Sequence, residues 1–249
     1  MKRFLKPIYL PLAALAFGVI TLLFRLWFLS LGVDDRGLLP VGSFPDVASW
    51  ILVAISIAIF AIGTWPLKGG NKYSHNFPPS DVAGIATCLA GISFLITSFT
   101  ELVVGADNIS TISVILGFLA AASLFFLGYC RWKNCRPSMI FHSIVCLYLM
   151  IYLISHYRLW SSAPQLQTYG FELLAIVFVM LACYHRAAFD ADCGNRRKYA
   201  FFSLAGLYFS IAALPGCDNY AFFIGCAIWL AATFCRLSHR RSASEEDQT

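Results

Sequence analysis

Long, uninterrupted runs of apolar residues dominate the chain, and short polar or turn-forming stretches separate them. The runs cover residues 8–30, 46–65, 82–103, 110–130, 138–157, 169–185, 199–214 and 220–235. Most are close to the roughly 20 residues that a helix needs to cross a bilayer, and they lack the alternation of barrel strands. The connecting stretches, such as PLKGGNKYSHNFPPS and DADCGNRRK, are too short for a globular domain. The pattern predicts an all-α, polytopic transmembrane bundle of about eight spans, a single integral membrane domain over 1–249 that ends in a short polar tail at 237–249.

The positions of the basic residues test this division independently. If the runs are spans, every Lys and Arg except Arg25, Arg36 and Arg158 falls on one side of the membrane. Because Lys and Arg in short loops favour the cytoplasmic side, both termini are predicted to be cytoplasmic and the chain to be a multi-pass protein of the cell membrane.

Composition supports a lipid environment and excludes several classes of function. The chain is 59% hydrophobic and 12% charged, and its net charge of +5 lies in juxtamembrane loops, so the expected partner is the lipid bilayer and no nucleic acid is expected. The nine cysteines fall mostly inside spans or at cytoplasmic ends, where free thiols are the better interpretation than a disulfide framework. No cofactor and no metal site are predicted.

Ionisable residues inside spans are costly and often mark a working site. Here they gather near the outer ends of the predicted helices, where a polar cavity could form. The candidate ligand-binding residues are Arg25, Thr97, Thr100, Glu101, His156 and Glu172.

Three interpretations of this outer group remain open. Arg25 could extend its guanidinium to the lipid headgroups, or pair with Glu101 or Glu172 as a structural link between helices. In the third interpretation it anchors a small polar or anionic molecule, because its planar fork binds carboxylate and phosphate in a bidentate way.

Two functions from different classes follow, and a third is weaker. The favoured hypothesis is a small-molecule binder or transporter component with an outward-facing polar pocket, working with energising partner subunits because no nucleotide-binding motif is present. The alternative is a non-catalytic accessory or assembly protein that contacts other membrane subunits, or forms an oligomer, through its helices. A membrane enzyme would require His185, Asp190, Asp192 and Cys193 to converge, and common catalytic motifs are missing from the sequence.

Two segments carry a likeness to a family, LWFLSLGVDDRGLLP at 26–40 and RRKYAFFSLAGLYFSIAALPG at 196–216. In these segments the chain resembles an uncharacterised family of small polytopic membrane proteins from anaerobic Gram-positive bacteria. The resemblance implies a location in the cytoplasmic membrane and implies no activity, so it assigns no functional residues.

Overall fold

The structure, a computed structural model, describes residues 9–32, 39–67, 71–104, 108–161, 165 and 169–235, and all regular elements among them are helices. The predicted tail at 237–249 lies outside the described residues. The helices are α1 (Tyr9–Ser30), α2 (Phe44–Thr64), α3 (Tyr73–Asn76), α4 (Asp81–Val104), α5 (Asn108–Lys133), α6 (Met139–Trp160), α7 (Gly170–Asp190), α8 (Arg196–Ala212) and α9 (Tyr220–Cys235). The all-α polytopic bundle predicted from the apolar runs is confirmed.

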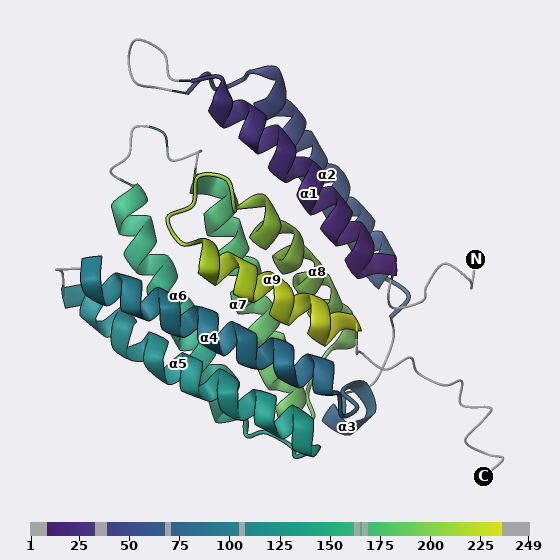
Figure 1. The fold of residues 1–249 in the computed structure, drawn as a ribbon. Helices are drawn as coiled ribbons and strands as arrows, with labels where there is room; N and C mark the ends of the chain where they lie inside the picture. Colours follow the sequence, from purple (N-terminus) through teal and green to yellow (C-terminus); the bar gives the residue numbers. More distant parts are fainter. Residues whose placement is uncertain are drawn as a thin grey trace.

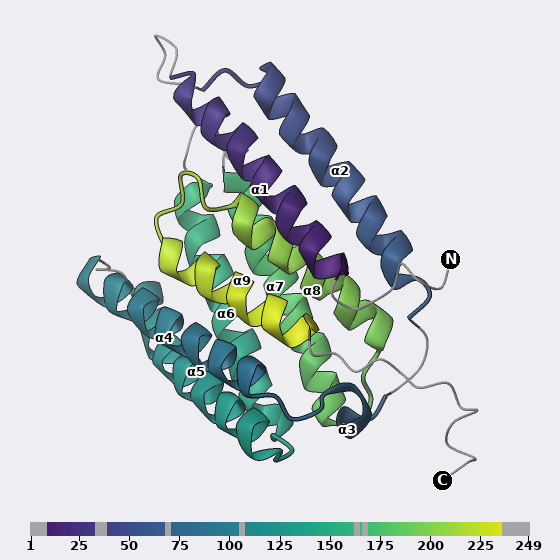
Figure 2. The ribbon, with the colours of Figure 1, turned by 45° about the vertical axis from the view of Figure 1, so that its right-hand side comes forward.

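The long helices form a bundle in which successive helices run in opposite directions. The α1–α2 hairpin lies on one side of the bundle, and α4 and α5 lie on the other (Figures 1 and 2). Between them are α7, α8 and α9, and α6 packs against α5 and α7. The short helix α3 lies at one end, beside the start of α4.

Helix α8 is the centre of the bundle and contacts α1, α2, α7 and α9. Every residue from Ser203 to Ala212 is buried. Its small residues permit this close packing: a methyl group added to Gly206 would come within 2.8 Å of Leu230 Cδ1 and 3.3 Å of the Val179 backbone nitrogen. Helix α8 also carries hydroxyl groups inside the bundle, and the hydroxyl of Tyr208 is hydrogen-bonded to Thr21 Oγ1 at 2.8 Å.

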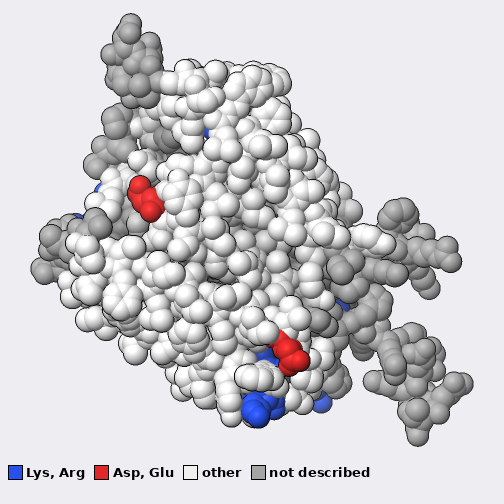
Figure 3. Space-filling model, in the orientation of Figure 1, with Lys and Arg blue, Asp and Glu red and all other residues white. Residues whose placement is uncertain are grey.

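Six of the helices, α1, α2, α4, α5, α6 and α7, are long and apolar enough to cross a membrane, and α9 is a shorter apolar helix. Large apolar side chains on these helices point away from the bundle, including Ile51, Ile62 and Phe99, which are 53%, 73% and 55% exposed. The face in Figure 3 is almost free of charged side chains, and Lys and Arg gather at its lower end. Such a surface matches a lipid solvent, so the chain is an integral membrane protein that contacts the lipid bilayer.

Three helices continue past the ends that the apolar runs predict. Helix α5 extends to Lys133, α6 to Trp160 and α7 to Asp190. The extensions of α5 and α7 place Arg131 and Arg186 on helices, where both are buried. The apolar runs end at residues 130 and 185, and so they predict both arginines in the flanking loops.

Candidate functional site

The bundle has two polar ends. The basic end holds the end of α5, the start of α6, the end of α7, the start of α8 and the short helix α3. The far end holds the opposite ends of the long helices, including most of the residues predicted as a ligand site. The charge pattern predicts that the basic end faces the cytoplasm.

At the far end, Arg25 is buried and links α1 to α7 and α8. Its Nη1 donates a hydrogen bond to the Ala212 carbonyl oxygen at 2.7 Å, and its guanidinium lies 4.5 Å from the centre of the Phe171 ring. Glu172, next along α7, is 3% exposed and interacts electrostatically with Arg25. Arg25 therefore contacts neighbouring helices instead of extending to the headgroups.

The remaining far-end residues form a second polar group. His156 Nε2 lies 3.5 Å from Glu101 Oε1, and the side chains of both are 15% exposed. Thr97 Oγ1 donates to the Ser93 carbonyl at 2.9 Å and to Asn219 Oδ1 at 3.3 Å. Thr100 donates its hydroxyl hydrogen to the carbonyl oxygen of Thr97 at 2.7 Å.

The charged far-end residues thus form two groups: Glu101 lies beside His156, and Glu172 lies within electrostatic range of Arg25. The buried phenol of Tyr152 interacts electrostatically with both Glu101 and Glu172, so both groups are within electrostatic range of one side chain. In the nearby α8–α9 connection, burial and the negative charge of Glu172 raise the pKa of the Cys217 thiol to about 12. That thiol therefore stays protonated at neutral pH. Ligand binding by the far-end group remains a prediction.

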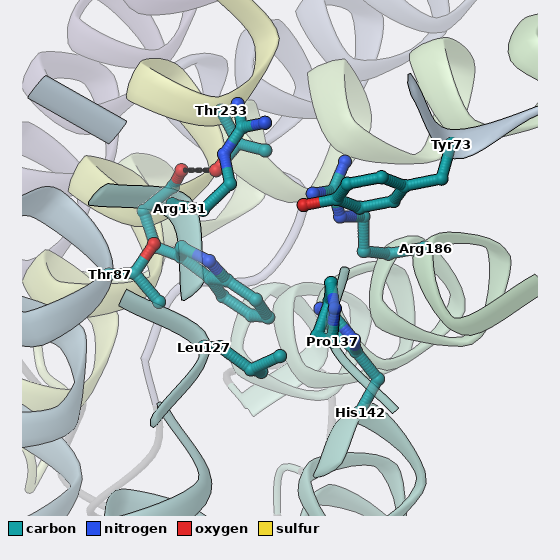
Figure 4. A pocket seen from close by; sticks show the side chains of 9 residues that line it. Tyr73, Thr87, Leu127, Arg131, Pro137, His142, Arg186 and Thr233 are labelled. Atoms are coloured by element: carbon teal, nitrogen blue, oxygen red, sulfur yellow. Dashed lines mark hydrogen bonds between the residues drawn. The ribbon is translucent and has the colours of Figure 1, made fainter. Parts of the chain in front are cut away.

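The basic end contains a pocket whose cavity measures about 10 Å³, the room of roughly one water molecule, and the open space at its mouth brings the empty space to about 280 Å³. Residues from α3, α4, α5, the α5–α6 connection, α6, α7 and α9 line it: Tyr73, Thr87, Leu127, Arg131, Pro137, His142, Arg186, Trp229 and Thr233. Figure 4 shows the side chains of Arg131 and Arg186 on its walls, with the Tyr73 ring beside Arg186. The pocket is therefore polar where the two arginines meet it and apolar where Leu127 of α5 and Trp229 of α9 line it.

Both arginines are almost completely buried, at 5% exposure for Arg131 and 4% for Arg186. Within the described residues, none of the three guanidinium nitrogens of Arg131 makes a hydrogen bond of good geometry, and neither does Nη1 of Arg186. Their clearest contacts are aromatic: the Arg186 guanidinium carbon lies 3.2 Å from the centre of the Phe77 ring, and that of Arg131 lies 5.4 Å from it. The hydroxyl of Tyr73 also faces the Arg131 guanidinium, as an electrostatic partner and as a hydrogen-bond acceptor of loose geometry.

Asp190, four positions after Arg186 on α7, is hydrogen-bonded to the side chain of His142. Its Oδ2 lies 2.6 Å from His142 Nδ1, and its backbone carbonyl accepts hydrogen bonds from Nε, at 3.0 Å, and Nη2 of Arg136. No ion pair joins Asp190 to Arg131 or Arg186 among the residues that the structure describes.

Asp192 fixes the short helix α3 to this network from outside the pocket. Its Oδ1 accepts a hydrogen bond from the Tyr73 backbone N–H at 3.0 Å, and its Oδ2 lies 2.9 Å from Arg136 Nη1. The hydrogen bond from Tyr73 and the charge of Arg136 lower the pKa of the Asp192 carboxyl. Asp192 thereby holds Tyr73 and Phe77 over the two arginines.

The energetic balance at the basic end leaves positive charge uncompensated. Burying an ion costs several kcal/mol even after relaxation, and Arg131 and Arg186 also repel each other. A desolvated cation–π contact returns only about 2 kcal/mol. Asp190 supplies one negative charge near these two positive ones, with Oδ2 hydrogen-bonded to His142 and Oδ1 buried without a hydrogen-bond partner among the described residues. One carboxylate and the aromatic contacts do not fully offset the cost of two buried guanidinium groups. A small anion in the pocket would supply the missing charge.

The predicted enzyme interpretation required four residues near this end to converge. Asp190 and Asp192 point to different partners, and the His185 ring stacks on Phe202 with ring centres 5.1 Å apart. Over the described ranges, no three His, Cys, Asp or Glu side chains come close enough to hold a metal ion.

Sequence reasoning did not identify Arg131 and Arg186 as site residues, because both lie at helix ends where basic residues serve orientation. One signal was available: Arg186 and Asp190 are separated by four residues and so share a helix face if the helix continues past His185. No family of proteins, curated protein or solved structure matches the chain.

Proposed function

We propose that this integral membrane protein binds a small anion in the pocket at its basic end, as a component of a transport system. The observation that carries the proposal is the pair of buried guanidinium groups, Arg131 and Arg186, which line one pocket without a carboxylate partner among the described residues. The sequence favoured a pocket at the far end, around Arg25. The contacts of Arg25 with Ala212, Phe171 and Glu172 instead favour a structural role there.

The chemistry of the walls indicates an oxyanion. Guanidinium groups bind carboxylate, sulfate and phosphate oxygens through charge-assisted hydrogen bonds. The hydroxyls of Thr87 and Thr233 each donate to their own helix, at 2.6 Å to the carbonyls of Ala83 and Trp229. The arginines are therefore the positively charged donors that the walls offer to a ligand.

An oxyanion at this position has two sources, a free solute or the phosphate of a lipid headgroup. Both offer the same oxygens to Arg131 and Arg186, so the pocket chemistry alone does not separate them. The described pocket is enclosed by seven segments of the chain, which favours a small free solute over a headgroup that must keep its acyl chains in the bilayer.

A thermal-stability screen tests the proposal, because a ligand that binds only the folded chain raises its stability by mass action. Purified wild type, Arg131→Gln and Lys133→Gln are heated in neutral detergent with sulfate, phosphate or acetate. Lys133 is the matched control, since it is exposed and lies on the same helix. At ten times the Kd, an anion should stabilise wild type and Lys133→Gln by about 1.4 kcal/mol and leave Arg131→Gln unchanged.

Nanodiscs separate the two sources of the anion. The ligand is a lipid headgroup if wild type is more stable in phosphatidylglycerol discs than in phosphatidylcholine discs and Arg131→Gln is equally stable in both. If neither free anions nor anionic lipid act through Arg131, the proposed function is refuted.

A second candidate function, assembly with other membrane subunits, rests on a different observation. Phe24, Trp27 and Phe44 form a cluster on the α1–α2 hairpin with ring centres 5.9 to 6.4 Å apart. Trp27 and Phe44 are 49% and 69% exposed. Such a cluster suits a membrane interface or a helix of a partner, and co-purification that is lost on Trp27→Ala would favour assembly.

A further inference from the structure

His142 lies in the wall of the arginine pocket and is 3% exposed. Its Nδ1 is hydrogen-bonded to Oδ2 of Asp190 at 2.6 Å. Its other ring nitrogen, Nε2, makes no hydrogen bond with any residue in the described part of the chain. This nitrogen is not fully buried. Figure 4 shows the His142 side chain beside Pro137, on the same cavity as the arginines. The imidazole therefore has a free position for a proton next to the proposed anion.

The groups that face His142 come from the two helices packed against α6. From α5, Arg131 interacts with it electrostatically, and from α7, Arg186 and Asp190 do so. The Cys183 thiol of α7 donates to the His142 carbonyl at 3.4 Å and carries no charge to the ring.

Two further groups act on His142 through neighbours. Arg136 donates to the backbone carbonyl of Asp190, and Tyr73 lies over Arg186 with its ring centre 5.2 Å from the guanidinium carbon. The imidazole thus has one carboxylate beside it and two buried cations across the pocket.

We propose that binding of an oxyanion in this pocket is coupled to the uptake of one proton by His142. This inference rests on the proposed function, since it concerns the same pocket. The proton comes from the solvent at the mouth of the pocket and adds to the free electron pair of Nε2, while Nδ1–H stays bonded to Asp190. No other bond is made or broken.

The coupling follows from the charges. A guanidinium opposes a positive charge on a nearby imidazole, and an anion favours it. When an anion neutralises Arg131 and Arg186, the imidazolium becomes easier to form, and its Nε2–H becomes an additional donor to the anion. By linkage, protonation of His142 must strengthen anion binding by the same factor.

The expected size is that of a typical coupling between sites, about 5-fold to 150-fold in affinity. The affinity should rise as the pH falls, because the protonated form of His142 is the form that binds the anion more tightly. A transport cycle built on this pocket would carry a proton with each anion.

Sulfate is the appropriate probe, because it remains a dianion over the range from about pH 5 to about pH 8 in which histidine titrates. Any pH dependence then belongs to the protein. The Kd for sulfate is measured by isothermal titration calorimetry across this range on purified wild type in neutral detergent. Proton uptake is measured in parallel with a pH indicator in weakly buffered solution.

The proposal predicts that sulfate binds at least 5-fold more tightly at the low end of this range than at the high end, and that binding takes up close to one proton where the coupling is strongest. His142→Gln, which keeps a donor for Asp190, should bind sulfate with a Kd that no longer depends on pH. The direct proton count in wild type keeps the test decisive if this variant does not fold.

The outcomes separate the two proposals. Arg131-dependent sulfate binding with no proton uptake and a constant Kd overturns the coupling and leaves the proposed function standing. Undiminished proton uptake in a folded His142→Gln variant overturns the assignment to His142. Failure of sulfate to bind wild type at any pH overturns the coupling together with the binding of this oxyanion class.

Discussion

The two ends of the bundle both bury arginine, and they place it in opposite electrostatic surroundings. At the far end, Arg25 has a carbonyl oxygen at 2.7 Å, an aromatic face and the neighbouring carboxyl of Glu172. At the basic end, Arg131 and Arg186 have aromatic faces, the Tyr73 hydroxyl and each other, and the carboxylate of Asp190 is hydrogen-bonded to His142. A buried charge with partners holds helices together, and one without partners costs stability until a ligand arrives.

The comparison predicts that the same substitution has opposite effects at the two ends. Arg25→Met should have the largest effect, a loss of about 3 kcal/mol in the free energy of unfolding, because it leaves the Ala212 carbonyl and Glu172 without a cation. Titration with sodium dodecyl sulfate in mixed micelles measures this energy. Arg25→Lys, which keeps the charge, is the control and should lose less.

If Arg25→Met instead unfolds like wild type, Arg25 is not a structural link. The interpretation of the far end as a ligand site would then regain support, and the predicted group around Glu101 and His156 would be the next target.

Arg131→Met should have the next largest effect, with the opposite sign. In anion-free buffer we expect a stability between unchanged and about 2 kcal/mol above wild type, because an uncompensated buried charge is replaced by an apolar side chain of similar length. The same titration compares it with Lys133→Met on the exposed face of α5. A loss comparable to that of Arg25→Met would mean that Arg131 has a structural partner, and would remove the basis of the pocket proposal.

The far-end pair of Glu101 and His156 should contribute less. Their side chains are partly exposed and 3.5 Å apart, so we expect a coupling energy of about 0.5 kcal/mol from a double-mutant cycle with Glu101→Gln and His156→Gln. A coupling of several kcal/mol would show that this pair, and not Arg25, is the main polar link at the far end.

The smallest effect concerns pH and the attachment of α3. The folded-state pKa of Asp192 is lowered by the Tyr73 N–H and by Arg136. Its carboxylate therefore stabilises the folded chain above the unfolded value of about 3.9, and this contribution is lost as the pH falls through the folded-state pKa. Wild type should unfold at a higher temperature than Asp192→Asn at neutral pH, and the difference should vanish in acid. A difference that persists in acid would contradict this assignment.

The fold followed from the sequence where one physical constraint dominates. The bilayer requires about 20 apolar residues per span and internal pairing of every backbone group, so α1, α2, α4, α5 and α6 lie close to the predicted runs. The short helix α3 was not predicted, because four residues in a Pro- and Gly-rich connection carry no periodic signal.

The candidate site was less predictable, for a physical reason. The sequence indicates that Arg131 and Arg186 lie near a membrane surface. It does not distinguish a buried arginine there from an arginine in a solvated loop. Their burial depends on Tyr73 and Phe77, which are distant in sequence. The Asp192 contact and the packing of Phe77 against Phe189 and Tyr199 hold these rings in place. The far-end pairings could be predicted more closely, since Arg25 with Glu172 was one of the alternatives, and their contacts needed only neighbouring helices.

Equilibrium dialysis with radiolabelled sulfate tests the central claim most directly. Wild type and Lys133→Gln should each show one saturable site per chain, and Arg131→Gln should show none while keeping a cooperative unfolding transition. Equal binding by all three proteins, or no saturable binding by wild type, would contradict an anion site between Arg131 and Arg186.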